Sequence, residues 1–271
     1  MKCKSFSLIA LLLLSCACSK DGGRSRPVQL RLALPGPATK VTMGEETAGT
    51  FPLLWQEGDQ VSLNGSMSNP MSAALSGKSH AAFSFADFSG SAPYNLLYPG
   101  SSAEEVVLDG KTLALYSSSE SLDGMFSLHH LCCGVRLSLT GDLTLASLSL
   151  SAPGGEKIAG RFTPSFADGS LSEVSANQSL TLDLDTPVVL SGEPRSLYLF
   201  FAPGTFSGGL SLKALNPGGT ITREWRFATG RTLEKGKLYL LPETAFTSRD
   251  WNDGCIVSLE GLTEDPISFE L

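Results

Sequence analysis

The sequence predicts an all-β protein built from antiparallel β-sandwiches. Apolar and polar residues alternate with period two in many short runs, which is the pattern of half-buried strands. Glycine, proline and aspartate turn signals separate these runs. No segment of about 12 or more residues keeps its apolar positions at helical spacing, and 28 glycines and 15 prolines would interrupt a helix. Many short strands joined by such turns are typical of a β-sandwich.

The N-terminus has the parts of a secretory signal. Lys2 and Lys4 form a short basic start, and Phe6 to Leu14 is an apolar run that only Ser7 breaks. Small residues follow this run, as they do before a signal cleavage site. The run is far shorter than the ~20 residues that a helix needs to cross a bilayer. We therefore expect residues 1–15 to be removed on export.

A cysteine directly after the apolar run resembles the lipobox of bacterial lipoproteins. Cys16 has leucine at position −3 and serine at −1, which fits the lipobox well, whereas Cys18 has serine at −3 and is the alternative site. The resemblance implies acyl chains, palmitate among them, and each buried CH₂ contributes ~0.8 kcal/mol to membrane binding. Residues 16–26 would then form a tether. The alternative is a soluble secreted protein with an ordinary signal.

The first expected strand lies in an N-terminal sandwich that spans residues 27–118. Val28, Leu30, Leu32 and Leu34 alternate with polar or small residues, so their side chains should point to one side and be buried. Burial of each such side chain contributes ~1.5–3 kcal/mol. We therefore expect this strand to stay in place.

A polar stretch is expected to divide the chain. Residues 117–124 are rich in serine, with Leu122 as their one apolar residue, and we place a domain boundary there. A second sandwich, separable from the first, is expected over residues 125–245. Its apolar runs lie at 135–139, 180–184, 197–201, 210–212, 225–227 and 238–241. The run at 197–201 is continuous, which predicts a strand buried on both faces.

Residues 246–271 form an expected C-terminal tail. Within it Ile256, Val257 and Leu259 lie in a short apolar run. This run could add one more strand to the fold, or it could pair with another molecule. It is the segment that we expect to serve any strand exchange.

Charge and cysteine content narrow the possible partners. The formal net charge is −7, and an acidic surface argues against nucleic acid as a partner. Beyond the lipobox only Cys132, Cys133 and Cys255 remain, too few for a disulfide framework. Cys132 or Cys133 could pair with Cys255, but small buried hydrophobes are the favoured interpretation. As neighbours on a strand, Cys132 and Cys133 should point to opposite faces.

The sequence has no motif of a known catalytic or phosphate-binding site. It lacks a Gly-x-Ser-x-Gly elbow, a His-Glu-x-x-His pair and a phosphate loop. His129 and His130 lie in a strand-like segment, where packing is the ordinary role, and His80 stands apart. Adjacent ligands on a strand diverge, so no zinc site is expected beside Cys132. We therefore expect no enzyme, no cofactor and no metal.

Two tryptophans could contact a ligand. Trp55 precedes an acidic turn and Trp251 sits inside one, and an exposed tryptophan can stack on a sugar ring. Burial is the more common state of a tryptophan in a sandwich. A carbohydrate-binding surface lipoprotein is therefore the alternative function.

Several short motifs follow one another along almost the whole chain. They are Cys18-Ser19-Lys20-Asp21, Thr39–Thr42, Trp55–Leu63, Tyr94–Pro99, His130–Leu137, Phe201–Phe206, Gly236–Tyr239 and Trp251–Gly254. In this order they resemble the fimbrillin-like lipoproteins of gut and oral Gram-negative anaerobes, a superfamily related to type V pili. The extra cysteine at 132 or 133 departs from the pattern.

The resemblance implies two tandem transthyretin-like β-sandwich domains, lipid-anchored in the outer membrane and exposed at the cell surface. It implies other fimbrillin-like subunits or host surface ligands as partners, and strand addition as the mode of assembly. In polymerising members a protease cuts at an arginine and releases the first strand. Here Arg24 and Arg26 precede that strand, Arg31 lies inside it and the next arginine is Arg136. We therefore expect an anchor-type or tip-type pilus component or a solitary adhesin.

Overall fold

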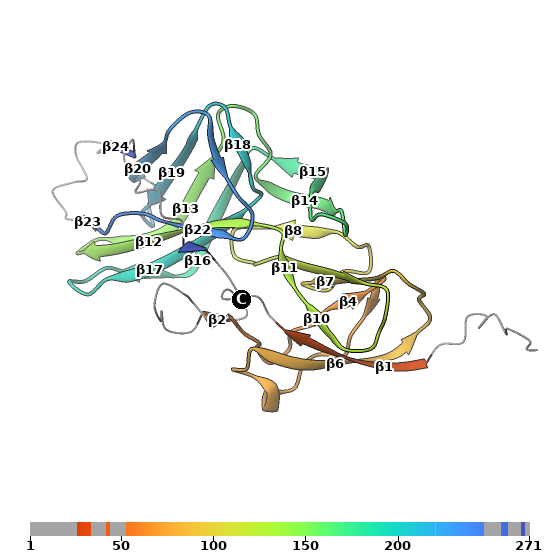
Figure 1. Cartoon of the computed structure of the whole chain (residues 1–271). Coiled ribbons are helices and arrows are strands. Elements are labelled where there is room, and N and C mark those ends of the chain that lie inside the picture. The colour runs from red at the N-terminus through yellow and green to blue at the C-terminus, as the bar shows by residue number, and fades with distance from the viewer. Residues whose placement is uncertain are drawn as a thin grey trace, which may run out of the picture.

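The computed structural model describes residues 26–33, 42–43, 53–219, 221–246, 256–259 and 267–268. Its regular structure is strand throughout, apart from one 3-10 turn at Ala73–Leu75, and most strand pairs are antiparallel (Figure 1). The predicted all-β fold class is confirmed. Within the described ranges no helix is long and apolar enough to cross a membrane. The predictions for Cys16, Cys18, Trp251 and Cys255 fall outside the described residues.

The first half of the chain is built on two sheets. Its strands are β1 Arg26–Ala33, β4 Ser62–Leu63, β5 Ser66–Met67, β6 His80–Phe88, β7 Tyr94–Tyr98, β9 Leu115–Ser119, β10 Met125–Ser127 and β11 His129–His130. One sheet has the order β10–β1–β6 and the other the order β11–β9–β7–β4–β5. A separate pair joins β2 (Thr42–Met43) to β3 (Leu53–Leu54). Side chains from both sheets form one apolar core.

The second half is a sandwich of two five-stranded sheets. Its strands are β12 Cys133–Gly141, β13 Thr144–Ser151, β16 Ser179–Val189, β17 Arg195–Phe201, β19 Leu210–Leu215, β20 Ile221–Phe227, β22 Lys237–Leu240, β23 Thr244–Phe246, β24 Ile256–Leu259 and β25 Ile267–Ser268. One sheet has the order β17–β12–β22–β25, with β23 also paired to β12, and the other has the order β16–β13–β19–β20–β24. Leucines, Trp225 and Phe246 fill a second core. The six apolar runs that predicted strands here all lie in strands or extend just past one.

Two smaller sheets complete the fold, and one of them links the halves. Strands β15 (Leu171–Asn177), β14 (Ala159–Pro164) and β8 (Val106–Leu108) form a three-stranded sheet, and β18 (Gly204–Phe206) pairs with β21 (Arg231–Leu233). Strand β8 comes from the first half of the chain but pairs with β14 of the second. An ion pair between Glu105 and Arg161 lies beside this junction.

The two cores meet on opposite faces of one sheet. Phe200 of β17 packs in the first core, while its neighbour Phe201 packs in the second. This confirms that the continuous run at 197–201 forms a strand with apolar contacts on both faces. Gly134 of β12 allows the close approach, because a Cβ there would lie 2.9 Å from the Phe200 ring. The sheet that contains β12 and β17 therefore lies between the two apolar cores and contributes side chains to both.

Cys132 and Cys133 follow the same rule. Cys132 belongs to the first core and Cys133 to the second, as expected for neighbours that point to opposite faces. Both are buried, free thiols, which confirms their interpretation as small buried hydrophobes. The Cys133 thiol donates to the carbonyl oxygen of Phe201 at a Sγ–O distance of 3.6 Å. Burial raises the pKa of Cys132 to about 12 and also raises that of Cys133, so both stay protonated and unreactive at neutral pH.

The polar stretch at 117–124 does not separate the two cores. Ser117 is buried within β9, and β10, which follows the stretch, pairs with β1 of the first sheet. Phe126, Leu128 and Leu131 all pack in the first core. The change of core falls between Cys132 and Cys133 instead. The serines mislead because Ser117, Ser118 and Ser119 belong to β9 itself, and of these three only Ser118 is exposed.

Candidate functional site

Strand β1 is held on both sides. It pairs antiparallel with β6 and parallel with β10, so it is the central strand of its sheet. Leu30 and Leu32 are fully buried, which confirms the prediction for these two residues, whereas Val28 is half-buried against the first core. Leu34 lies outside the described residues. Release of β1 would break two hydrogen-bonded ladders and expose these side chains.

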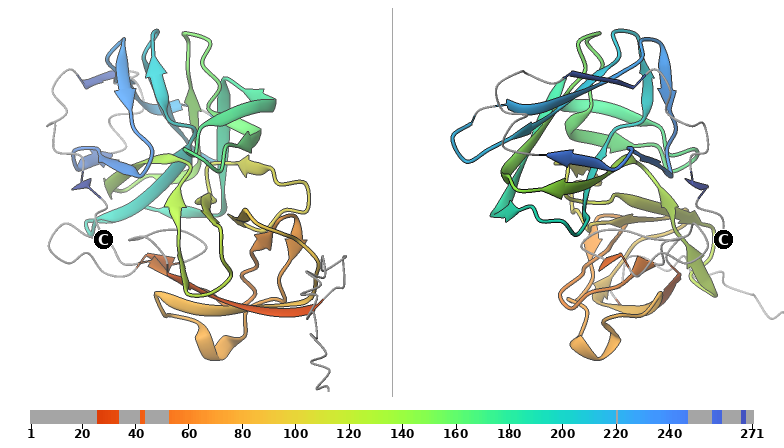
Figure 2. Two further views of the ribbon diagram at one scale, coloured as in Figure 1. Left: turned by 45° about the vertical axis from the view of Figure 1, so that its right-hand side comes forward. Right: turned by 90° about the vertical axis from the view of Figure 1, so that its left-hand side faces the viewer.

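The two tail strands occupy the ends of the second half's sheets. Strand β24, which contains Ile256, Val257 and Leu259, pairs in parallel with β20, and β25 pairs antiparallel with β22. Each is the last strand in its sheet order. Both are drawn in dark blue against the second half in Figure 2. The tail thus supplies one end strand to each sheet of the sandwich, and each tail strand is paired on one side among the residues that the structure describes.

Trp55 is a core residue and not a sugar-stacking platform, which corrects that prediction. Its side chain is fully buried, and its ring packs edge-on against Phe83 and Tyr98 at centroid distances of 4.8 and 5.3 Å. The turn that follows explains the motif, because Gly58 adopts a positive φ of 84°. Asp59 accepts hydrogen bonds from the Tyr98 hydroxyl at 3.0 Å and from the Gln56 amide at 2.7 Å.

The three histidines differ in their burial. His130 is half-buried as a whole, but both of its ring nitrogens are buried. Their burial, with a smaller contribution from the neighbouring charge of His129, lowers the pKa of His130 to about 4. It is therefore neutral at physiological pH. His80 and His129 are exposed. Among the described residues no group of three or more His, Cys, Asp or Glu side chains could hold a metal ion.

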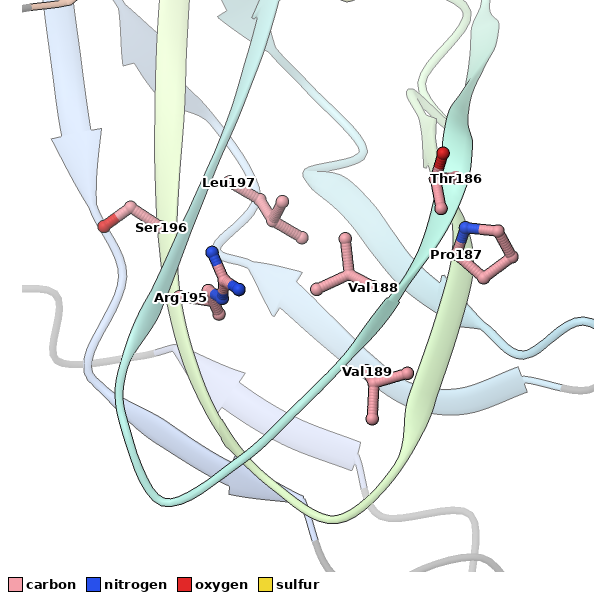
Figure 3. A pocket seen from close by; sticks show the side chains of 7 residues that line it. All are labelled: Thr186, Pro187, Val188, Val189, Arg195, Ser196 and Leu197. Atoms are coloured by element: carbon pink, nitrogen blue, oxygen red, sulfur yellow. The ribbon is translucent and has the colours of Figure 1, made fainter.

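An open notch lies in the second sandwich, between the end of β16 and the start of β17. These two strands are at the opposite ends of their sheets from the tail strands β24 and β25. The notch has a volume of about 340 Å³, and it is lined by Thr186, Pro187, Val188, Val189, Arg195, Ser196 and Leu197. Figure 3 shows Val188 and Leu197 pointing toward one another, with the Arg195 side chain between the two strands and Ser196 turned away. Val188 and Leu197 are half-buried against the second core, while Val189 is 66% exposed.

A bulge in β16 opens this notch. Four residues, 184–187, lie opposite the single residue Ala146 of β13, because the register moves from Asp183↔Ser147 to Val188↔Leu145. Pro187 has no N–H to donate to a ladder, so proline in a strand is typical of bulges and sheet edges. No pattern in the sequence predicted the notch. Pro187 followed by two valines was the one available signal.

A second hollow of about 470 Å³ lies near the junction of the halves. Its lining combines hydroxyl, carboxylate and apolar side chains: Met67, Pro99, Gly100, Ser101, Ser102, Glu105, Val106, Val107, Asp109 and Thr112. Glu105 is engaged with Arg161, and Asp109 accepts hydrogen bonds from the amides of Lys111 and Thr112 at 3.0 and 2.9 Å. Both carboxylates are therefore already used to hold the surrounding loops.

Comparisons with known proteins give structural neighbours alone. No family model matches the chain, and neither does any curated protein. A proposed cell adhesion protein of Bacteroides ovatus is 11% identical, with 82% of this chain and 93% of that chain covered and a TM-score of 0.49. One from Bacteroides uniformis is 13% identical over 82% and 95%, with a TM-score of 0.46. A fimbrial protein of Bacteroides vulgatus is 12% identical over 59% and 66%, with a TM-score of 0.34.

Proposed function

We propose that this protein is a cell-surface, fimbrillin-like lipoprotein that acts as an anchor-type or tip-type pilus component or as a solitary adhesin. It would be lipid-anchored in the outer membrane through Cys16 and would bind another fimbrillin-like subunit or a host surface. The ordered motifs and the lipobox support this proposal at the level of sequence. The all-β fold, with end strands that come from the tail, supports strand addition as the mode of binding.

The position of the tail strands is the observation that carries the proposal. Strands β24 and β25 pair with β20 and β22 at the ends of two different sheets. A strand that is paired on one side can leave its own sheet and form equivalent backbone hydrogen bonds in a second copy of the protein. Exchange therefore changes the total number of backbone hydrogen bonds very little. Strand β1 is paired on both sides and would lose more. The proposal therefore assigns strand exchange to the tail and keeps the groove under β1 closed.

Engineered cysteines across the β20–β24 pair test this assignment. Arg226 and Ser258 are register partners, so single variants Arg226→Cys and Ser258→Cys are made in a Cys255→Ser background. The two single variants are then refolded together under oxidising conditions. Exchange predicts a disulfide-linked dimer of the two chains. A variant that carries both cysteines is the control, and it should form the disulfide within its own chain. If it does so and the mixed single variants give no dimer, the tail does not exchange and the strand-addition function fails.

The lipid anchor has its own test. In cells fed a radiolabelled or clickable palmitate, the wild-type chain should be labelled and Cys16→Ala should not. Labelling that persists in Cys16→Ala and is lost in Cys18→Ala would move the anchor to the alternative cysteine. An unlabelled wild-type chain would contradict the lipoprotein assignment altogether.

A carbohydrate-binding surface lipoprotein is the second candidate. Buried Trp55 cannot serve as its platform, but the hollow between Met67 and Thr112 offers three hydroxyl side chains beside exposed Val107. Hydroxyl groups that flank an apolar surface suit a sugar ring. A glycan array with the mature chain tests this function, with a Ser102→Trp variant that fills the hollow as the control. Equal signals from the two proteins would exclude the hollow as a sugar site.

A further inference from the structure

We propose that the notch between β16 and β17 binds an extended, carboxylate-bearing segment of a partner protein, added as a strand beside β17. This site lies at the opposite ends of the two sheets from the tail strands. In one sheet β17 is the first strand and β25 the last, and in the other β16 is the first and β24 the last. The proposal does not depend on exchange of the tail.

Among the described strands, none pairs with the start of β17 on the side away from β12. Strand β17 pairs with β12 along its whole length from Arg195 to Phe201. On the other side, the amide of Phe200 donates to the carbonyl oxygen of Gly110 at 3.0 Å, which forms an isolated bridge. Backbone groups of alternate residues point the same way in a strand. The N–H of Ser196 therefore points toward the open edge.

The facing strand β16 is protected against the same event. Its bulge at residues 184–187, Pro187 and the exposed Asp183 and Asp185 are the features by which natural edge strands avoid new partners. Asp185 is also paired with Lys111 at 2.8 Å. A strand that enters the notch would thus pair with β17 and use β16 only as a side-chain wall.

The side chains around the notch define what the added strand must carry. Val188 and Leu197 already touch the second core, and Val189 is largely exposed. An apolar side chain placed between them would cover this surface. The volume of about 340 Å³ is enough for two or three side chains and too small for a folded element. The ligand class is therefore an extended peptide with alternating apolar residues.

Arg195 supplies the charge preference. Its exposed side chain reaches into the notch, and within the described residues it has no ion-pair partner, although Glu193 lies two residues away. The protein is otherwise acidic, with a net charge of −7. A carboxylate on the added strand would be attracted to the one cation in the notch lining. The acidic remainder of the protein would attract a basic segment at long range, so the preference for a carboxylate depends on the short-range contact with Arg195.

A fluorescein-labelled, blocked peptide of sequence Thr-Val-Glu-Val-Thr-Val is the probe, read by fluorescence anisotropy against the full mature chain. We expect saturable binding, weakened about tenfold by Arg195→Glu, as loss of a charge-assisted hydrogen bond predicts. A peptide with lysine in place of glutamate should bind Arg195→Glu better than wild type. Arg31→Glu reverses an exposed charge on β1 and should leave binding unchanged.

Backbone pairing needs a separate readout. Ser196→Pro removes the N–H that points to the open edge and should abolish binding while the thermal midpoint stays within a few degrees. Hydrogen exchange of the segment 195–199 should slow when the glutamate peptide binds. The proposal is overturned if the peptide does not bind at about 1 mM, if Arg195→Glu and Arg31→Glu behave alike, or if protection appears elsewhere. If Ser196→Pro does not fold, the charge-swap pair and the exchange map decide alone.

Discussion

The first strand and the two tail strands are held in the fold in different ways. Strand β1 lies between β6 and β10 and buries two leucines completely. Strands β24 and β25 each pair with one neighbour at the end of a sheet. Removal of β1 would split its sheet, whereas removal of a tail strand would shorten a sheet by one member. The same secondary structure therefore has a different mechanical role at the two ends of the chain.

This difference bears on how the protein could bind a partner. A strand can be donated only if the rest of the domain stays folded without it. The loss of the strand must therefore cost less than the net stability of a domain, which is about 5–15 kcal/mol. The tail meets this requirement by its position, and β1 does not.

Leu32→Asp should destabilise the protein by about 4 kcal/mol or more. Leu32 is fully buried in the central strand of its sheet, so the variant both removes apolar contacts and places a carboxylate where nothing can solvate it. Urea unfolding of the soluble mature chain measures the effect. Arg31→Asp, at the exposed neighbouring position, is the matched control and should change stability by less than about 1 kcal/mol. Equal effects from the two variants would mean that β1 is not held as described.

Acid should destabilise the first half through His130. Its pKa is about 4 in the folded chain, against about 6.5 in an unfolded one. Between these two pH values His130 binds a proton in the unfolded chain but not in the folded chain. The free energy of unfolding therefore falls as the pH drops from about 6.5 to about 4. The difference of about 2.5 units corresponds to at most about 3 kcal/mol.

Urea unfolding at a series of pH values isolates this contribution. His130→Gln should lose the part of the pH dependence that falls between pH 6.5 and 4, whereas His129→Gln, at the exposed neighbour, should keep it. A wild-type slope that is unchanged in His130→Gln would show that this imidazole is accessible to water and that the first core is less closed than its burial indicates.

Tyr98→Phe should cost about 1–3 kcal/mol. The hydroxyl of Tyr98 donates to the buried carboxylate of Asp59 at 3.0 Å, and its loss leaves that oxygen without this donor. Thermal unfolding compares the variant with Tyr94→Phe, which removes a hydroxyl from a half-buried ring beside Phe88 and should have little effect. If Tyr98→Phe leaves the thermal midpoint unchanged, the hydrogen bond from Tyr98 to Asp59 does not stabilise the Trp55–Asp59 turn.

Local pattern was enough to predict the strands but not their partners. The alternation at Val28–Leu32 and the continuous run at Leu197–Phe201 both record burial, which the sequence carries directly as apolar side chains. The division of the cores depends on which distant strands pair. Residues 125–127 look like the start of a new domain in sequence, yet they lie beside β1 because β10 pairs with it. No local signal records that pairing.

The candidate site shows the same limit. Trp55 stands beside an acidic turn in sequence, but its burial depends on Phe83 and Tyr98, which lie 28 and 43 residues further along the chain. The notch at Arg195 depends on a register shift against β13, and Pro187 alone does not fix the size of the bulge. Side-chain type is local information, whereas exposure and register are properties of the assembled sheets.

Deletion of residues 254–271 should have the smallest effect on stability, on the order of 1 kcal/mol. The deletion removes β24 and β25, each paired on one side, and leaves both halves with their own apolar cores. It also uncovers the edges of β20 and β22, and exposed edges attract other strands.

The truncated chain should therefore self-associate more than the full chain in analytical ultracentrifugation. A synthetic peptide of residues 254–271 should suppress that association and restore the thermal midpoint. A peptide with Pro in place of Val257 should not, because it lacks an N–H in the β24 ladder. If the deletion instead unfolds the second half, the tail is an integral part of the sandwich and cannot be the segment that is exchanged.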